Sequence, residues 1–149
     1  MAVFGEARGA SIDGKRAVAQ VILNRAGFPH IVFGSRKDTS LIENIRWVVL
    51  RNVRGIYQFS CFDPEDVNCK KLLRPDEYEP SAVWDECYGV AQESLAAVGT
   101  PDLLTQNSDH YFDESIQTPK WAKAEKKTIT IGRLSFYRIY IPAISQVKP

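Results

Sequence analysis

The hydrophobic pattern of this chain changes its period near residue 127, and this change limits the folds that the chain can adopt. Before that point, apolar residues recur at helical spacing in three segments. After it, β-branched and aromatic residues form strand-like runs. Helices followed by neighbouring strands are typical of the α+β class. The predicted helices cover 14–26, 40–51 and 81–98, and the predicted strands cover 127–131 and 134–141.

Local capping signals mark the ends of the predicted helices. We expect Asp13 to cap the first helix and Gly27 to end it. Ser40 and Glu43 have the spacing of a capping box, in which the side chain of each residue accepts a hydrogen bond from the backbone amide of the other. Gly99, which a proline follows closely, ends the third helix. The sequence therefore predicts boundaries as well as element types.

The C-terminal part reads as a β-hairpin. Gly132 and Arg133 separate its two strand-like runs, as a tight turn requires. A short helix is also predicted near 119–124. The fold is therefore expected to be mainly helical, with a small antiparallel β-hairpin or sheet.

Length and charge bound the function. The 149 residues suit one compact domain, so we predict a single domain over 1–149. The formal net charge of +1 gives no electrostatic reason to expect nucleic acid or a membrane surface as a partner. The N-terminal residues lack a basic leader followed by an apolar core, so we expect no signal peptide and synthesis in the cytoplasm. No apolar run is long enough for membrane insertion.

The cysteines and histidines give little support for a metal site. The three cysteines are Cys61, Cys69 and Cys87, and no Cys-x-x-Cys pair occurs among them. The two histidines, His30 and His110, lie far apart in the sequence. We therefore expect no metal and no cofactor. The sequence leaves open whether Cys61 and Cys69 pair, and Cys87 falls in an apolar helical pattern typical of a core residue.

Glu6 is the first candidate for catalysis. It stands between Phe4-Gly5 and Ala7-Arg8-Gly9. Apolar surroundings disfavour the ionised form of a carboxylic acid, and an acid that keeps its proton can serve as a proton donor. Cleavage of a glycosidic bond needs such a donor at the leaving oxygen. The alternatives are a structural glutamate paired with Arg8 and a surface glutamate on a first helix.

Other candidate residues lie in two long loops, 52–79 and 100–118, which could form the walls of a cleft. In the first loop, Gln58 and Ser60 could hydrogen-bond sugar hydroxyl or acetamido groups. The alternative is a loop whose aromatic residues anchor it to the core.

Three aromatic positions and a histidine complete the candidates. His110 and Tyr111 lie in the second loop, and Trp121 follows it. Tyr137 lies in the second predicted strand, where it could face a cleft. For each of them the alternative is a packing role in the core.

In order along the chain, these pieces resemble one family, the cell wall hydrolases that include the spore cortex-lytic enzymes. The resemblance covers nearly the whole chain, and its most specific part is the first two motifs taken together. The motifs are Gly5-Glu6-Ala7-Arg8-Gly9, Ala17 to Arg25, Phe28-Pro29, Gln58-Phe59-Ser60, His110-Tyr111-Phe112, Pro119-x-Trp121-Ala122, and Ile131-Gly132 with Phe136-Tyr137.

The resemblance implies a lysozyme-like α+β fold and cleavage of peptidoglycan glycan strands between N-acetylmuramic acid and N-acetylglucosamine. It implies that Glu6 is the catalytic residue and that the chain is a catalytic domain. Many members are lytic transglycosylases, in which one carboxyl group acts first as acid and then as base, without metal. We expect Gln58, Ser60, Asp109, His110, Tyr111, Trp121 and Tyr137 to bind the substrate, and we expect a monomer.

The chain departs from the family pattern at three places. The family's second glutamate is replaced by Ala10, and its strand histidine by Leu134. The usual Gly-Ala-rich segment before His110 is replaced by a polar one that includes Asp109. Asp109 could therefore supply a carboxylate that the usual pattern lacks.

Two alternatives remain open at this point. A hydrolytic muramidase or glucosaminidase would need a carboxylate such as Asp109 to hold water. A non-catalytic glycan-binding domain is suggested by the losses at Ala10 and Leu134. A small domain of this kind also looks like a phage endolysin, which would reach the cell wall after release by other means.

Overall fold

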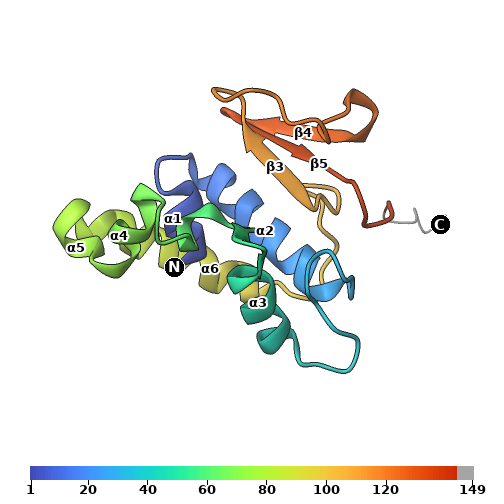
Figure 1. Cartoon of the computed structure of the whole chain (residues 1–149), viewed down its shortest axis with the longest axis horizontal. Coiled ribbons are helices and arrows are strands. Elements are labelled where there is room, and N and C mark those ends of the chain that lie inside the picture. The colour runs from blue at the N-terminus through green and yellow to red at the C-terminus, as the bar shows by residue number, and fades with distance from the viewer. Residues whose placement is uncertain (144–149) are drawn as a thin grey trace.

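A computed structural model describes residues 1–143 of the chain. It combines a group of helices with a three-stranded antiparallel sheet that lies over one side of them (Figure 1). The predicted α+β class is confirmed. The helices are α1 Ala2–Ala7, α2 Ile12–Gly27, α3 Leu41–Leu50, α4 Val67–Leu73, α5 Pro75–Tyr78 and α6 Ser81–Ala96, with 3-10 turns η1 Ser60–Phe62 and η2 Ala124–Lys126. The strands are β1 Asn52–Val53, β2 Ile56–Tyr57, β3 His110–Asp113, β4 Lys127–Ile131 and β5 Leu134–Tyr137.

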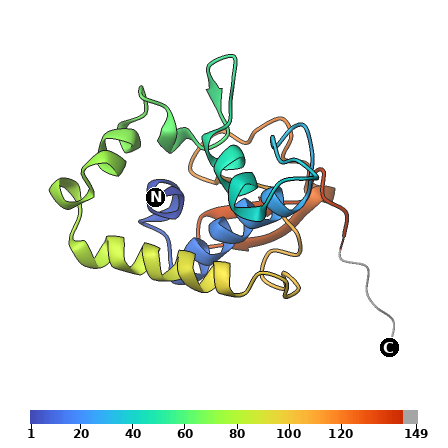
Figure 2. The same cartoon turned by 90° about the horizontal axis from the view of Figure 1, so that it is seen from below.

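Helix α1 lies in the middle of the helical part. Seen along its axis, it is surrounded by α2, α4, α6 and the η1 turn (Figure 2). Its side chains Val3, Phe4 and Ala7 are buried, and the Phe4 ring meets the edge of Trp84 at 5.2 Å between ring centroids. A six-residue helix is not stable alone in water. Tertiary packing therefore fixes α1 and the position of Glu6 on it.

Helix α2 forms the centre of the core. Ala17, Val18 and Val21 are fully buried at helical spacing, as the sequence pattern predicts. The predicted cap at Asp13 is wrong, because Ser11 is the N-cap and its Oγ accepts a hydrogen bond from the Gly14 amide at 3.2 Å. The helix begins at Ile12, two residues before the prediction, and Asp13 lies in its first turn.

The other two predicted helices are confirmed. Ser40 and Glu43 form the expected capping box at the start of α3. Helix α6 begins at Ser81, as predicted, and its last helical residue is Ala96. Cys87 is buried on its inner face. All three cysteines are free thiols, so Cys61 and Cys69 do not pair.

The predicted hairpin of β4 and β5 forms the larger part of a sheet with strand order β3-β5-β4. Gly132 adopts a φ of 59° in the connecting turn, a conformation that glycine adopts without strain. Strand β3 comes from the segment predicted as a loop, and in it Tyr111 is paired with Phe136. The helix predicted near 119–124 is wrong, because only a 3-10 turn forms, at Ala124–Lys126.

Both faces of this sheet are covered. Phe136 and Leu134 belong to the core, and Tyr111 packs against that core on the same face. On the other face, the Trp121 ring meets Phe112 at 6.0 Å and Tyr137 at 5.5 Å between centroids. The segment that leads into β4 therefore covers the outer face, and the inner face closes over the helices.

The sequence predicts a long loop over 52–79, but this segment contains the β1-β2 hairpin, η1, α4 and α5. These elements are too short to show a periodic pattern in the sequence. Within residues 1–143, no helix has the length and apolar character that crossing a membrane requires.

Candidate active site

The carboxylate of Glu6 connects three parts of the chain. Its Oε1 accepts a hydrogen bond from the Cys61 amide at 3.1 Å, and its Oε2 accepts one from the Tyr111 hydroxyl at 2.8 Å. Glu6 lies in the last turn of α1, Cys61 in η1 and Tyr111 on β3. Two donors on separate elements therefore determine the orientation of the carboxylate plane.

Gly5 makes the contact between α1 and η1 possible. A Cβ atom at this position would lie 2.6 Å from both Cβ and Sγ of Cys61, closer than nonbonded atoms approach. Only glycine lets η1 come near enough for the Cys61 amide to reach Glu6. The Gly5-Glu6 pair is thus a packing requirement beside a candidate catalytic group.

Tyr111 is placed by the register of the sheet. Its ring packs against that of Phe136, its partner on β5, at 5.7 Å between centroids. Burial, together with the neighbouring Glu6 carboxylate, raises the pKa of Tyr111 well above its usual range. Tyr111 therefore remains a protonated hydrogen-bond donor to Glu6 at any physiological pH.

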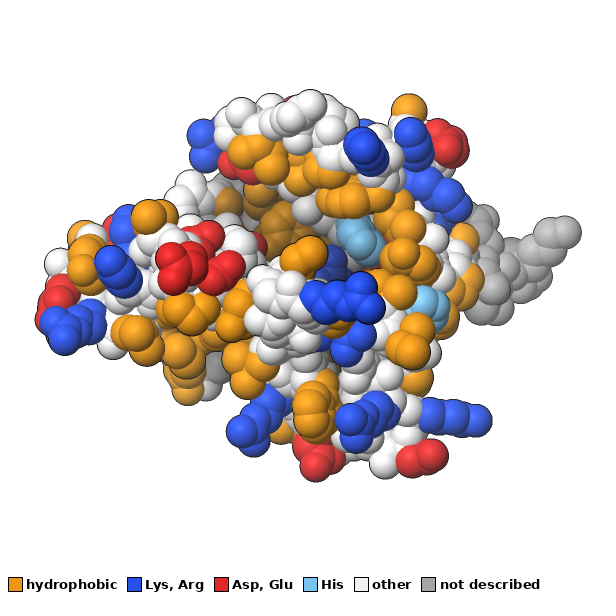
Figure 3. Space-filling view, viewed as in Figure 1, with side chains coloured by type: hydrophobic (Ala, Val, Ile, Leu, Met, Phe, Trp, Pro, Cys, Tyr) orange, Lys and Arg blue, Asp and Glu red, His pale blue; other side chains and the backbone are white. Residues whose placement is uncertain are grey.

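A cavity of about 270 Å³ opens beside Glu6, between the end of α1 and the β4-β5 turn. The molecular surface is also hollowed between the sheet and the helical part, where hydrophobic side chains are visible (Figure 3). The cavity is lined by Glu6, Ala7, Gly9, Ala10, Ser11, Asp113, Ile131, Gly132, Arg133 and Leu134.

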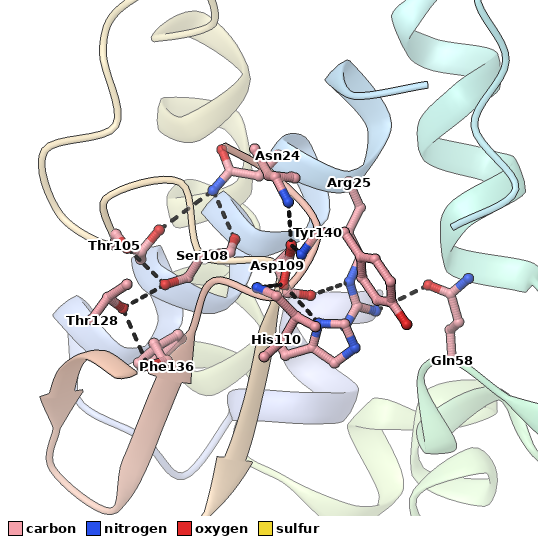
Figure 4. A network of polar contacts seen from close by, with 12 residues as sticks. Asn24, Arg25, Gln58, Thr105, Ser108, Asp109, His110, Thr128, Phe136 and Tyr140 are labelled. Atoms are coloured by element: carbon pink, nitrogen blue, oxygen red, sulfur yellow. Dashed lines mark hydrogen bonds and ion pairs between the residues drawn. The ribbon is translucent and has the colours of Figure 1, made fainter. Parts of the chain in front are cut away.

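Arg25 is a buried cation in the polar network that contains Gln58 and Asp109 (Figure 4). Its Nε donates to the Asp109 carbonyl oxygen at 2.6 Å, and its Nη1 donates to Gln58 Oε1 at 3.0 Å. Its guanidinium lies over the rings of Phe33 and Phe59, at 5.5 and 5.1 Å from their centroids. Burial lowers the pKa of Arg25, and the nearby Tyr111, Asp109 and Glu6 side chains oppose that effect. Arg25 thus ties α2 to two loops.

The side chain of Gln58 is fully used within the protein. Its Oε1 accepts the bond from Arg25, and its Nε2 donates to the carbonyl oxygens of Val32 and Phe33 at 2.9 and 3.0 Å. The predicted contact of Gln58 with sugar has no support in this geometry, which fits a loop anchor. Ser60, two residues on, is exposed at the start of η1.

Asp109 is fully buried and lies outside the Glu6 cavity. Its Oδ1 accepts from the Ile139 amide at 2.9 Å and meets His110 Nδ1 at 2.7 Å. Its Oδ2 accepts from the amides of Tyr140 and Ile141 at 2.6 and 2.8 Å. Burial alone would raise the pKa of Asp109, but these hydrogen bonds outweigh it and lower the pKa. The arrangement fits a role in fixing the segment after β5.

The remaining aromatic candidates cluster on the outer face of the sheet. His110 lies 4.9 Å from Trp121 and 5.7 Å from Tyr140 between ring centroids. Tyr137 is buried beneath Trp121 and stacks on Phe112 at 5.8 Å. Of the residues predicted to bind substrate, the structure thus brings only Tyr111 into contact with Glu6.

Several residues of the site were not singled out as candidates from the sequence. Asp113 lines the Glu6 cavity, and its Oδ1 accepts from the Ser115 amide at 2.8 Å, which lowers the pKa of its carboxyl group. Arg133 lies beside it, with Nη2 3.3 Å from Asp113 Oδ2. The available signals were positional: Asp113 follows the His-Tyr-Phe motif, and Arg133 lies in the hairpin turn.

Two of the three departures from the family pattern, Ala10 and Leu134, meet in this cavity. A Cβ placed on Gly14 would lie 3.0 Å from Ala10 Cβ and 3.8 Å from Leu134 Cδ1, so both side chains face one point of α2. Both residues also line the cavity beside Glu6. An acidic residue and a histidine of the usual pattern are thus replaced together by an apolar pair.

Within residues 1–143, no group of three or more His, Cys, Asp or Glu side chains is arranged to bind a metal ion.

Comparison with known proteins identifies the family. No curated protein and no solved structure matches this chain. The model of the family described as Cell Wall Hydrolase matches residues 9–137. The matched region includes α2, Tyr111 and the β4-β5 hairpin, and it begins three residues after Glu6. Because this match covers most of the sequence, the chain belongs to the cell wall hydrolase family.

Proposed function

We propose that this protein cleaves peptidoglycan glycan strands between N-acetylmuramic acid and N-acetylglucosamine as a lytic transglycosylase, with Glu6 as its general acid and base. Family membership makes peptidoglycan of the cell wall the substrate. The observation on which the proposal depends is the position of Glu6, oriented by Tyr111 and the Cys61 amide at the edge of a cavity.

In the proposed first step, protonated Glu6 donates its proton to the glycosidic oxygen, and the bond to the muramic acid anomeric carbon breaks. A carboxyl group has about four lone-pair positions, so each oxygen can accept one protein hydrogen bond and still exchange a proton with the substrate. The two protein donors, Tyr111 and the Cys61 amide, are in place before the substrate arrives. This fixed orientation reduces the cost of reaching the transition state.

In the second step, Glu6 is a carboxylate and acts as base. It removes the proton from the 6-hydroxyl of the same muramic acid, whose oxygen then bonds to the anomeric carbon. The product is a 1,6-anhydro end, and Glu6 is protonated again. No water is consumed, so one carboxyl group is enough.

The surroundings of Asp109 support this single-carboxylate mechanism. Both of its oxygens are occupied by backbone amides and His110, and the side chain is fully buried. Such a carboxylate is badly placed to hold an attacking water. The requirement of a hydrolase for a second carboxylate is therefore not met by Asp109 in this geometry.

Asp113 gives a second candidate function, hydrolysis, a specific structural basis. It lines the same cavity as Glu6, and its lowered pKa keeps it ionised at neutral pH. An inverting or retaining glycosidase pairs such a carboxylate with a proton donor. If the enzyme hydrolyses its substrate, we expect Asp113 rather than Asp109 to activate the attacking water or to bond to the anomeric carbon.

Mass spectrometry of digested sacculi tests the proposal. Transglycosylation gives 1,6-anhydromuramic ends, and hydrolysis gives reducing ends. We expect anhydro ends, a loss of activity by a factor of about 10²–10⁴ in Glu6→Gln, and little loss in Asp113→Asn. Asp76→Asn, an exposed carboxylate on α5, is the matched control.

Other outcomes separate the alternatives. Reducing ends together with inactive Asp113→Asn support the hydrolase. The wild type and Glu6→Gln could also bind strands equally well without cleaving them. This result supports the non-catalytic glycan-binding domain and contradicts both the transglycosylase and the hydrolase.

A further inference from the structure

The cavity beside Glu6 has one cationic group. Within the described residues 1–143, Arg133 is the only Lys or Arg among the residues that line it. Its side chain is 75% exposed, and its contact with Asp113 is 3.3 Å long. An exposed ion pair of this kind is weak, because water screens it. The guanidinium can therefore exchange Asp113 for a carboxylate of a ligand, which it can bind through two parallel hydrogen bonds.

The wall close to Arg133 is apolar. Leu134 is the next residue in the chain, and its side chain, like that of Ala10, packs toward Gly14. Leu134 is buried and Ala10 is partly buried. The β4-β5 turn thus places a cation and a small apolar surface side by side on one cavity. A ligand group that matches this surface has a carboxylate and a methyl group on the same carbon.

We propose that Arg133, together with Ala10 and Leu134, forms a subsite for an α-methyl carboxylate of the peptidoglycan strand. Two groups of the polymer have this chemistry: the lactyl ether of muramic acid, where its carboxyl group is free, and the terminal D-alanine of a stem peptide. In both, one carbon bears a methyl group and a carboxylate. The inference rests on the proposed function for its substrate, and it assigns to Arg133 a role in binding rather than in proton transfer.

Binding to strands by the Glu6→Gln protein tests this subsite without turnover. Three kinds of strand are compared. The first is stripped of peptide, so that its lactyl carboxylate is free. The second keeps stem peptides that end in D-alanine, and the third is stripped and then converted to neutral lactyl amides. We expect Arg133→Gln to weaken binding about tenfold or more on the first or the second, and to change nothing on the third. Arg133→Lys, which keeps the charge, should recover part of the loss.

The pattern of losses identifies the ligand. A loss only on stripped strands assigns the lactyl carboxylate, a loss only on peptide-bearing strands assigns D-alanine, and a loss on both assigns the shared chemistry. Arg74→Gln is the matched control, since Arg74 is an exposed arginine paired with Glu77 on α5. Equal binding by Arg133→Gln and its parent, an equal loss on the neutral strands, or no binding of any strand overturns the inference.

A pair of competitors tests the apolar wall. N-acetylmuramic acid and its 3-O-carboxymethyl analogue differ only in the methyl group next to the carboxylate. We expect the methylated compound to compete several-fold better, and Leu134→Asn to abolish the difference. Equal competition by both compounds rules out the apolar part of the subsite. Product analysis of the wild-type enzyme is independent of these assays, so a failure of the proposed cleavage is distinguishable from a failure of the subsite.

Discussion

Tyr111 donates a 2.8 Å hydrogen bond to Glu6 although the two residues are 105 positions apart in the sequence. The bond joins strand β3 of the sheet to helix α1 at the candidate catalytic group. Both residues depend on long-range packing for their positions, since α1 is short and, within residues 1–143, β3 pairs only with β5. The geometry of the site is thus a property of the whole fold.

Tyr111→Phe removes this donor while keeping the ring. A hydrogen bond to a charged group is worth about 1.5–3 kcal/mol, so we expect kcat to fall roughly ten- to a hundredfold with little change in KM. Initial rates of strand cleavage measure the effect. Tyr78→Phe, at an exposed position on α5, is the control. An unchanged kcat means that Tyr111 does not orient Glu6 during catalysis.

Gly5→Ala should separate η1 from α1. In an open helix position, alanine would stabilise the protein by about 1 kcal/mol relative to glycine. Here its Cβ would lie 2.6 Å from Cys61, so we expect a net destabilisation of about 1–3 kcal/mol. Activity should fall as well, because the Cys61 amide moves away from Glu6. Urea denaturation and cleavage assays measure the two effects.

Gly89→Ala, on α6, is the matched control for Gly5→Ala. Nothing lies within 4 Å of a Cβ at this position, so we expect wild-type activity and a stability equal to wild type or up to about 1 kcal/mol higher. Equal behaviour of the two variants contradicts the packing role of Gly5.

Gln58→Leu distinguishes an anchor from a sugar ligand. The change removes the acceptor of Arg25 Nη1 and the donor to two loop carbonyl oxygens, and we expect a loss of about 1–3 kcal/mol in unfolding free energy. KM for glycan strands should stay within about twofold of wild type under conditions where the variant is folded. Gln92→Leu, at an exposed position on α6, controls for the added apolar surface. A large rise in KM with unchanged stability would instead support the sugar contact expected from the sequence.

Asp109→Asn should destabilise the protein in a pH-dependent way. The folded-state pKa of Asp109 lies below its ordinary value of 3.8, so its ionised form stabilises the folded state. This contribution is fully present above the unfolded-state pKa and is lost as the pH falls through the folded-state pKa. We expect a loss of about 2–4 kcal/mol at pH 7, which shrinks as the pH is lowered below about 4.

Denaturation curves at several pH values measure the Asp109 effect. Asp85→Asn, exposed on α6, should show no such trend. A destabilisation that is independent of pH would show that the charge of Asp109 does not stabilise the fold. Loss of cleavage in the folded variant would return Asp109 to the candidates for catalysis.

Local patterns of the sequence were sufficient for the longer elements. The helical spacing over α2, the capping box at Ser40 and the hairpin turn at Gly132 each depend on residues close together in the chain, and each is confirmed. The cap of α2 was assigned to Asp13 instead of Ser11, because two residues with capping side chains stand near the same helix start. Elements such as α4 and β3 were not predicted, because their seven and four residues contain only about two repeats of a helical or strand pattern.

The motif order in the sequence determined the family, which the match over residues 9–137 confirms, and it placed Glu6 at the centre of the proposed chemistry. Only the tertiary structure decided which residues meet Glu6: the Cys61 amide, Tyr111 and a cavity that includes Asp113 and Arg133. It also placed Gln58 and Asp109 in internal networks. The reason is physical, because caps and periodicity act within a few residues, whereas burial and hydrogen bonding at this site join segments that only the packed core brings together.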